Sequence, residues 1–226
     1  MKPVGILGGM GPEATILLMQ KVLGAVRAAD DADHIPLIVH QNPQVPSRIA
    51  HLIEGTGPDP ADTLAAMARD LQRAGAMALA MPCNTAHHYA GAVSGAVDLP
   101  FLDMVTLTAN ALAADGARRI GLLASPATQR TGVFDAAFAA HGLTAIGAPD
   151  GDAMLALIRA LKAGQDRATL TPAFLEGAAA LRDLGADHLL IACTEFSLLA
   201  PALPREWTHS DSLDHLVKEI VAFARG

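Results

Sequence analysis

The two cysteines of this chain stand in similar sequence settings. Cys83 lies in MPCNTAHH (Met81–His88), Cys193 lies in ACTE (Ala192–Glu195), and the 226 residues contain no other cysteine. Each cysteine follows a short apolar run of the kind that forms a buried strand, and each has a threonine within two positions. A single cysteine in such a place is usually a small core residue. Two of them in matching places, with polar neighbours, indicate chemistry.

The surroundings of the two cysteines repeat along the chain. The cysteines are 110 positions apart, and so are Gly75 and Gly185, each of which begins a Gly-Ala pair before the apolar run. VGILGG at Val4 and IGLLAS at Ile120 also match, 116 positions apart. A repeat of this length predicts two similar halves.

Each half alternates short apolar runs with alanine-rich amphipathic segments. This rhythm predicts an α/β fold in which parallel sheets are covered by helices on both faces. Strands are expected at Val4–Leu7, Leu37–His40, Ala76–Met81, Leu99–Asp103, Ile120–Ala124 and Leu189–Ala192. Helices are expected at Glu13–Ala29, Ala61–Ala74, shortly after Cys83, and at Thr131–His141, Met154–Ala163, Pro172–Leu184 and Leu213–Arg225.

The fold predicts where the cysteines lie. Ligands of open α/β sheets bind beyond the carboxyl ends of the strands, so two halves related by a pseudo-two-fold axis would place Cys83 and Cys193 on opposite sides of one cleft. A helix N-terminus near each cysteine is expected to lower the thiol pKa. One thiolate would then remove a proton from a carbon, and the other thiol would return a proton to the opposite face. This inverts the stereocentre without a metal or organic cofactor.

Polar groups beside the cysteines are expected to bind the substrate. Backbone N–H groups and the side chains of Asn84, Thr85 and Thr194 suit a carboxylate and the negative charge that develops on it.

Four motifs in order resemble one enzyme family. They are GGMGPEAT (Gly8–Thr15), NPQVPSR (Asn42–Arg48), PCNTAH (Pro82–His87) and ACTE, and together they span nearly the whole chain. Their combination resembles the aspartate/glutamate racemases that work without pyridoxal phosphate. The resemblance implies that Cys83 and Cys193 are the two acid/base residues. It also implies substrate contacts from Arg48, from Lys162 in LKAG, and from Met10 and Gly11 in a loop that lines the cleft.

The resemblance further implies two α/β domains with the active site between them, usually in a homodimer. The first domain would comprise residues 1–103 and 210–226, and the second residues 104–209. His87 is expected to support the site. Glu195 would either orient a thiol or take part in a structural hydrogen bond.

Some positions depart from the family pattern. Ala192 stands where the family often has glycine, Phe196 and Ser197 where it often has Leu-Pro, and Ser47 where an aspartate commonly precedes the arginine. These changes flank the reacting groups, so aspartate, glutamate or a broader set of amino acids stay open as substrates.

Three other interpretations fit parts of these motifs. Cys83, His87 and His88 resemble part of a zinc site, but no second cluster completes a tetrahedral set. Gly9–Ala14 fits the G-x-G-x-x-A pattern of a dinucleotide site, which is weak when it occurs alone. A two-lobed binding protein without catalytic activity would also have a cleft between α/β domains.

The composition limits the function classes. A formal net charge of −7 argues against a nucleic-acid partner, because binding phosphates requires a basic patch. The sequence contains no run of eighteen apolar residues, so it predicts no membrane span. Two cysteines do not make a disulfide framework, and the first residues resemble a strand more than a signal peptide. A reducing cytoplasm is the expected location.

Overall fold

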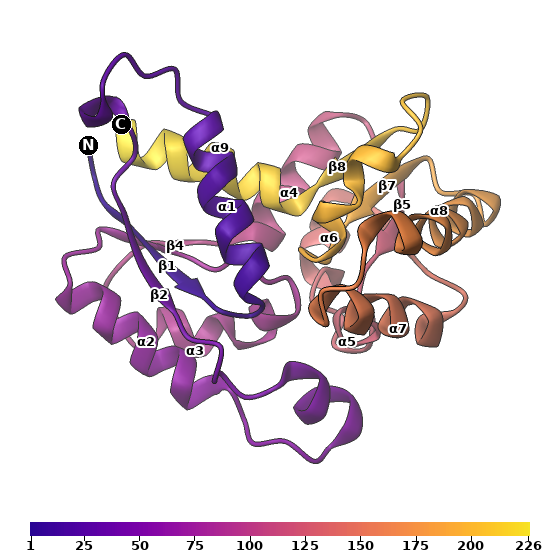
Figure 1. Ribbon diagram of the computed structural model, residues 1–226, viewed down its shortest axis with the longest axis horizontal. Coiled ribbons are helices and arrows are strands. Elements are labelled where there is room, and N and C mark those ends of the chain that lie inside the picture. The colour runs from indigo at the N-terminus through magenta and orange to yellow at the C-terminus, as the bar shows by residue number, and fades with distance from the viewer.

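The computed structural model describes residues 1–226 and contains two four-stranded sheets in which every strand pair is parallel (Figure 1). The first sheet has the order β2-β1-β3-β4, and the second has the equivalent order β6-β5-β7-β8. The strands are β1 (Val4–Gly8), β2 (Leu37–Gln41), β3 (Ala78–Ala80), β4 (Phe101–Leu102), β5 (Arg119–Leu123), β6 (Thr144–Gly147), β7 (His188–Ile191) and β8 (His209–Asp211). The predicted α/β class with two similar parallel-sheet halves is confirmed.

Nine α-helices surround the two sheets. They are α1 (Pro12–Gly24), α2 (Ala61–Arg73), α3 (Ala90–Ser94), α4 (Met104–Ala114), α5 (Pro126–Arg130), α6 (Asp135–His141), α7 (Gly151–Lys162), α8 (Arg167–Asp183) and α9 (Ser212–Arg225). A π-helical segment at Ala50–Glu54 lies between β2 and α2. None of these helices combines the length and the apolar character that a membrane span needs.

The repeat in the sequence is present in the packing of the sheets. A Cβ atom added to Gly5 in β1 would lie 2.9 Å from the Cβ of Ala76, and one added to Gly121 in β5 would lie 2.9 Å from the Cβ of Ala186. Real Cβ atoms do not approach so closely, so each strand needs glycine there to let its neighbour pack. The two halves therefore share the same internal contacts at the sequence offsets of the repeat.

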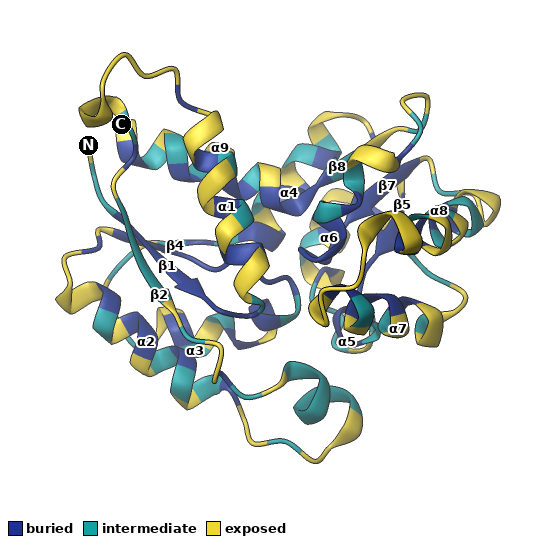
Figure 2. Cartoon of the chain, viewed as in Figure 1, coloured by how far each residue is buried: buried dark blue, intermediate teal, exposed yellow.

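Each sheet carries a hydrophobic core on both faces (Figure 2). The first sheet packs against α1 and α9 on one face and against α2 and α3 on the other. The second packs against α7 and α8 on one face and against α4 and α6 on the other. The last helix, α9, thus belongs to the core of the first sheet and also packs against α4 (Figure 1). The domain boundaries given above stay a prediction.

The helix expected at Thr131–His141 starts four residues later than expected. α5 ends at Arg130, and α6 begins at Asp135. Gly132 between them has φ of +59°, a left-handed conformation that breaks the helical path and that glycine adopts at low cost. The helix expected to reach Ala29 ends earlier, at Gly24.

Four of these helices and strands had no sequence prediction: α4, α5, β6 and β8. α4 lies between the two halves and is apolar on most sides, which hides the amphipathic period. β6 and β8 are edge strands of three or four residues with polar or exposed positions, so they lack the apolar run of a central strand. Their existence depends on pairing with β5 and β7.

Candidate active site

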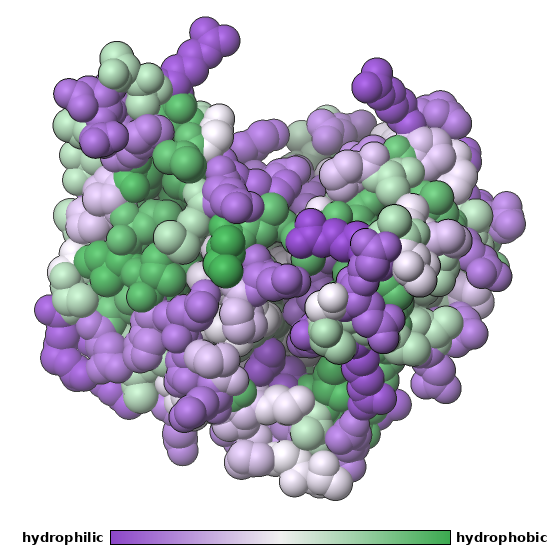
Figure 3. All heavy atoms as spheres, viewed as in Figure 1, coloured by the Kyte–Doolittle hydropathy of each residue, from purple (hydrophilic) through white to green (hydrophobic).

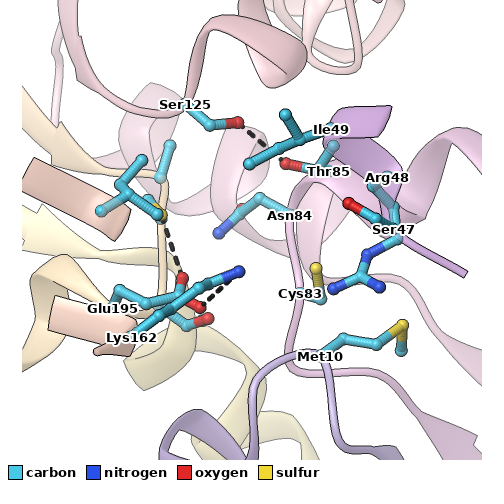
Figure 4. Close-up of a pocket in the computed structure, with 14 residues that line it drawn as sticks. Met10, Ser47, Arg48, Ile49, Cys83, Asn84, Thr85, Ser125, Lys162 and Glu195 are labelled. Carbon is cyan, nitrogen blue, oxygen red and sulfur yellow. Dashed lines mark hydrogen bonds and ion pairs between the residues drawn. The ribbon is translucent and has the colours of Figure 1, made fainter. Parts of the chain in front are cut away.

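Both cysteines lie just beyond the carboxyl ends of central strands, Cys83 after β3 and Cys193 after β7, and both line one cavity between the two halves (Figure 4). Most of the residues predicted for the site line this cavity with them. These are Met10, Arg48, Cys83, Asn84, Thr85, Lys162, Cys193, Thr194 and Glu195. Gly11 lines an adjoining outer pocket, and His87 lines neither space.

The cavity has an inner and an outer part. The inner part is narrow, about 40 Å³, and the outer pocket is about 500 Å³. Ser47, Arg48, Lys162 and Glu195 line both spaces. We call these four residues the neck. The neck thus places two cations and one carboxylate where the two spaces meet.

Cys193 has a direct hydrogen-bond partner. Its thiol donates to Oε2 of Glu195 at a distance of 3.1 Å. Burial, and then the adjacent carboxylate of Glu195, raise the pKa of the Cys193 thiol well above its usual range, while the charge of Lys162 acts in the opposite direction. The expected lowering of this pKa was therefore wrong. A turn of 3-10 helix at Phe196–Leu198 follows the motif, and so short an element provides no long helix dipole to offset burial.

Glu195 connects the buried thiol to the neck. Its Oε1 lies 3.3 Å from Nζ of Lys162, which projects from the last turn of α7, and Figure 4 shows both contacts. The Glu195 side chain is almost wholly buried, whereas that of Lys162 is partly exposed. Glu195 thus contacts the Cys193 thiol and the neck at once, and its role in the site stays a prediction.

Arg48 presents a cation that no carboxylate neutralises. Its Nη1 donates to the backbone carbonyls of Pro46 at 2.9 Å and of Val45 at 3.3 Å, which holds the guanidinium against its own loop. Its Nε is buried and has no hydrogen-bond partner. A buried donor without a partner is costly, so this group suits an anionic ligand in the neck.

The side-chain amide of Asn84 has a hydrogen bond at its nitrogen and none at its oxygen. Its Nδ2 donates to Oγ of Ser212 at 2.9 Å, and Ser212 in turn donates to the carbonyl of Ile191 at 3.0 Å. The Oδ1 of Asn84 is buried without a partner. The side chain therefore has a fixed orientation at the cavity wall and an oxygen free to accept a hydrogen bond.

Hydroxyl groups join the two halves across the cleft. Thr85 Oγ1 lies 3.0 Å from Oγ of Ser125 and 2.7 Å from Oγ1 of Thr128. From the other half, Thr194 donates to the carbonyl of Pro82 at 3.3 Å. Both predicted threonines thus line the cavity while their hydroxyls already bond within the protein. Ser125 also lines the cavity and was not predicted, although it occupies the end of β5 that matches Gly9 at the end of β1.

His87 lies outside the cavity and contacts the backbone of Cys83. Its buried ring donates from Nδ1 to the carbonyl of Cys83 at 2.8 Å and accepts at Nε2 from the N–H of Met104 at 3.2 Å, in the tautomer that these partners assign. Burial lowers the pKa of His87, which favours the neutral ring. Because backbone groups occupy both nitrogens, His87 is not free to bind zinc as the metal interpretation required.

The glycine-rich loop after β1 has its own packing reason. Gly9 has φ of +95°, and a Cβ atom added to it would lie 2.4 Å from the backbone of Asn42. Its N–H donates to Oγ1 of Thr15 at 2.9 Å. The glycine is needed for these local contacts, which removes the main support for a dinucleotide site.

The π-helical segment at Ala50–Glu54 connects the first half to the second next to the neck. Oε1 of Glu54 lies 2.9 Å from Nη2 of Arg159 in α7, and Nη1 of Arg130 in α5 donates to the carbonyl of Ile53 at 3.1 Å. We call Ala50–Glu54 the bridging segment. It begins two residues after Arg48, so these contacts lie close to the arginine in the chain.

A family model and solved structures match the chain along nearly its full length. The family model described as Asp/Glu/Hydantoin racemase matches residues 7–220. An aspartate racemase from Picrophilus torridus shares 27% identity over 100% of this chain and 95% of its own, with a TM-score of 0.89.

Two further structures show the same fold at lower identity. They are a putative Asp/Glu racemase from Yersinia pestis (24% identity, 100% of each chain, TM-score 0.79) and a glutamate racemase from Francisella tularensis (16% identity, 98% of this chain and 80% of that one, TM-score 0.69). The family match confirms the expectation of an enzyme of the amino-acid racemase type. By its sequence and its fold, the chain belongs to the Asp/Glu/Hydantoin racemase family.

Proposed function

We propose that this chain is a cofactor-independent racemase of an acidic amino acid, aspartate or glutamate, in which Cys83 and Cys193 exchange protons with Cα. One observation carries the proposal above all: the two cysteines of the chain come from equivalent strand ends of a repeat and line the same cavity.

The reaction needs one cysteine as a thiolate and the other as a protonated thiol. The thiolate of one cysteine takes the α-proton, so the Cα–H bond breaks and an S–H bond forms. The thiol of the other cysteine then gives its proton to the opposite face of Cα. The configuration inverts, and the two cysteines have exchanged protonation states. Exchange with water restores the starting state.

The negative charge that develops on the substrate needs nearby donors. The backbone N–H groups that follow each cysteine supply them for the α-carboxylate, whereas the unpaired Oδ1 of the fixed Asn84 side chain suits a donor such as the substrate ammonium group. Donors already fixed in a water-poor cavity lower the barrier more than mobile ones do.

The neck supports an acidic side chain on the substrate. Arg48 has no carboxylate partner, and Lys162 shares its charge with Glu195, so the neck carries one positive charge in excess. A second carboxylate on the substrate would occupy this position with charge-assisted hydrogen bonds. The similar structures named for aspartate racemase, and for glutamate racemase in complex with D-glutamate, agree with a dicarboxylic substrate.

The function is tested by proton NMR in D2O without added cofactor. L- and D-aspartate and L- and D-glutamate are supplied separately, and the α-proton signal is followed while polarimetry follows inversion. Exchange with inversion for one pair supports the proposal and identifies the substrate. If none of the four exchanges, the choice of acidic substrates is wrong. Binding without exchange would favour the binding-protein alternative.

Single cysteine variants test the two-base scheme. Cys83→Ser and Cys193→Ser should each reduce racemisation by about a thousandfold or more, because a hydroxyl is a far weaker acid than a thiol and does not ionise to a base at neutral pH. Slow exchange of the α-proton from a single enantiomer would be compatible with the scheme. Full racemisation by either variant would contradict it.

A homodimer in the cytoplasm completes the proposal. α1 exposes Ile16, Met19 and Leu23 on successive turns, and Figure 3 shows apolar side chains gathered on this side of the molecule. Such a patch offers a surface to a second copy. The molar mass in solution, measured by light scattering, decides between monomer and dimer.

A further inference from the structure

The two cysteines occupy equivalent places in unequal surroundings. Glu195 stands two residues after Cys193, and its Oε2 accepts a hydrogen bond from the Cys193 Sγ at a distance of 3.1 Å. Two residues after Cys83 stands Thr85, whose hydroxyl bonds to Ser125 and Thr128 instead. The thiol of Cys83 makes no hydrogen bond in the structure. The repeat is therefore broken at the residue that contacts the thiol.

The contact with Glu195 selects one protonation state of Cys193. An ionised carboxylate only accepts hydrogen bonds, so the contact exists only while the sulfur carries its proton. A thiolate at the same position would face a like charge at close range. Lys162, at 3.3 Å from the other carboxylate oxygen, partly offsets that charge.

We propose that Glu195 is a positioning residue that holds Cys193 as a thiol in the free enzyme, so that Cys193 is the resting proton donor and Cys83 the resting base. This proposal rests on the proposed function and deepens it. In the first half-reaction the Cys83 thiolate takes the α-proton, and the S–H proton of Cys193 passes to the other face of Cα. The free enzyme is then poised for the enantiomer whose α-hydrogen faces Cys83.

The charged groups around Cys193 come from several elements. Glu195 lies on its own loop, Lys162 reaches it from α7, and Arg48 and Cys83 line the same cavity from the first half. Burial and Glu195 raise the pKa of Cys193, and Lys162 lowers it. These opposing influences predict opposite effects when either charge is removed.

Alkylation of the full chain with iodoacetamide tests the proposal, because the chain contains only these two thiols. Cys83 and Cys193 are equally exposed, at 8% each, so a difference in rate reports ionisation more than access. We expect Cys83 to be labelled at least about tenfold faster than Cys193 at neutral pH, measured by mass spectrometry of peptides. Equal rates, or faster labelling of Cys193, would overturn the proposal.

Variants in a Cys83→Ser background test the role of Glu195 itself. Glu195→Gln should lower the pH midpoint of Cys193 alkylation by about one unit or more, and Lys162→Met should raise it. Glu195→Asp keeps the charge and should leave the midpoint above that of the Gln variant. A residue with a purely structural role would not move the midpoint in opposite directions.

Two controls keep the result interpretable. Glu176→Gln removes an exposed carboxylate of α8 and should leave the midpoint unchanged. If Glu195→Gln does not fold, the labelling of the unaltered chain and the Lys162→Met shift decide the outcome. An unchanged or raised midpoint in a folded Glu195→Gln variant would overturn the proposal. Because labelling needs no turnover, these results are independent of whether acidic amino acids are racemised.

Discussion

At the scale of single residues, the site contains groups whose hydrogen bonds are incomplete. Arg48 Nε and Asn84 Oδ1 are buried without partners at the cavity, whereas Thr85, Thr194 and His87 are fully engaged within the protein. A buried polar atom without a partner costs stability, so these two atoms at the cavity suit the polar groups of a ligand. The engaged residues hold the cysteine loops in place.

Arg48 provides a test at this scale. Arg48→Gln keeps a polar side chain but removes the charge that faces the neck, so kcat/KM for a dicarboxylic amino acid should fall by about tenfold or more. Steady-state racemisation of aspartate or glutamate measures the fall. Alanine, which lacks the second carboxylate, is the control substrate and should lose less. An equal loss for acidic and neutral substrates would remove the assigned role of Arg48.

At the scale of elements, short connections determine the geometry of the site. The bridging segment (Ala50–Glu54) has no apolar period and adds only the half-buried Leu52 to the core of the first sheet, yet its two contacts to α7 and α5 hold Arg48 beside the cavity. The N-terminal cap of α9 is a second short connection of this kind. Its Asp211 accepts a hydrogen bond from the N–H of Leu213 at the point where the chain returns to the first half.

Breaking the contact of the bridging segment should change binding more than stability. Glu54 and Arg159 are both exposed, and exposed ion pairs contribute little to folding. Glu54→Ala should therefore leave the melting temperature nearly unchanged while KM rises several-fold, because Arg48 is less ordered. The charge-swapped double variant Glu54→Arg with Arg159→Glu should recover most of the KM. Asp70→Ala, which breaks an exposed pair with Arg73, is the control and should leave KM as it was.

The cap of α9 predicts a dependence of stability on pH. Burial raises the pKa of Asp211 from 3.8 to about 6, so the folded chain binds this proton more tightly than the unfolded chain does. Its stabilising contribution is full below about pH 4 and is lost as the pH rises through about 6. Asp211→Asn still caps the helix and should gain stability relative to the original chain over that range, by a few kcal/mol.

Chemical denaturation at several pH values measures this gain. Asp62→Asn, at an exposed position in α2, is the control and should show no such pH-dependent difference. A constant difference between the Asp211→Asn variant and the original chain at all pH values would contradict the predicted role of Asp211.

At the scale of the whole molecule, the two halves are built alike but are not independent. α9 supplies core residues to the first sheet and packs against α4, which covers the second. The hydroxyl bonds across the cleft and the bridging segment add further connections. The relative position of the cysteines therefore depends on the packing of the entire chain.

One core substitution tests this coupling. Leu216 in α9 is fully buried, and Leu216→Ala should lower the free energy of unfolding by about 2–5 kcal/mol through lost burial and a residual cavity. Because α9 joins the two halves, both should unfold in one transition, followed by circular dichroism and by the fluorescence of Trp207 in the second half. Leu184→Ala, at a largely exposed position, is the control. Two separate transitions, with only one of them shifted, would show that the halves are independent.

Local patterns in the sequence determined the parallel strands, most of the long helices and the repeat that pairs Cys83 with Cys193. These features depend on neighbours in the chain: apolar runs, amphipathic periods and glycine stops carry their own signal. The strands β6 and β8 and the helix α4 carried no such signal, because partners far along the chain stabilise them. Only the tertiary structure decided which polar atoms are left unpaired, that His87 lies behind the cavity, and that Glu195 contacts both Cys193 and Lys162. Such contacts and the resulting pKa of Cys193 depend on burial and on charges brought together by folding, which no local pattern encodes.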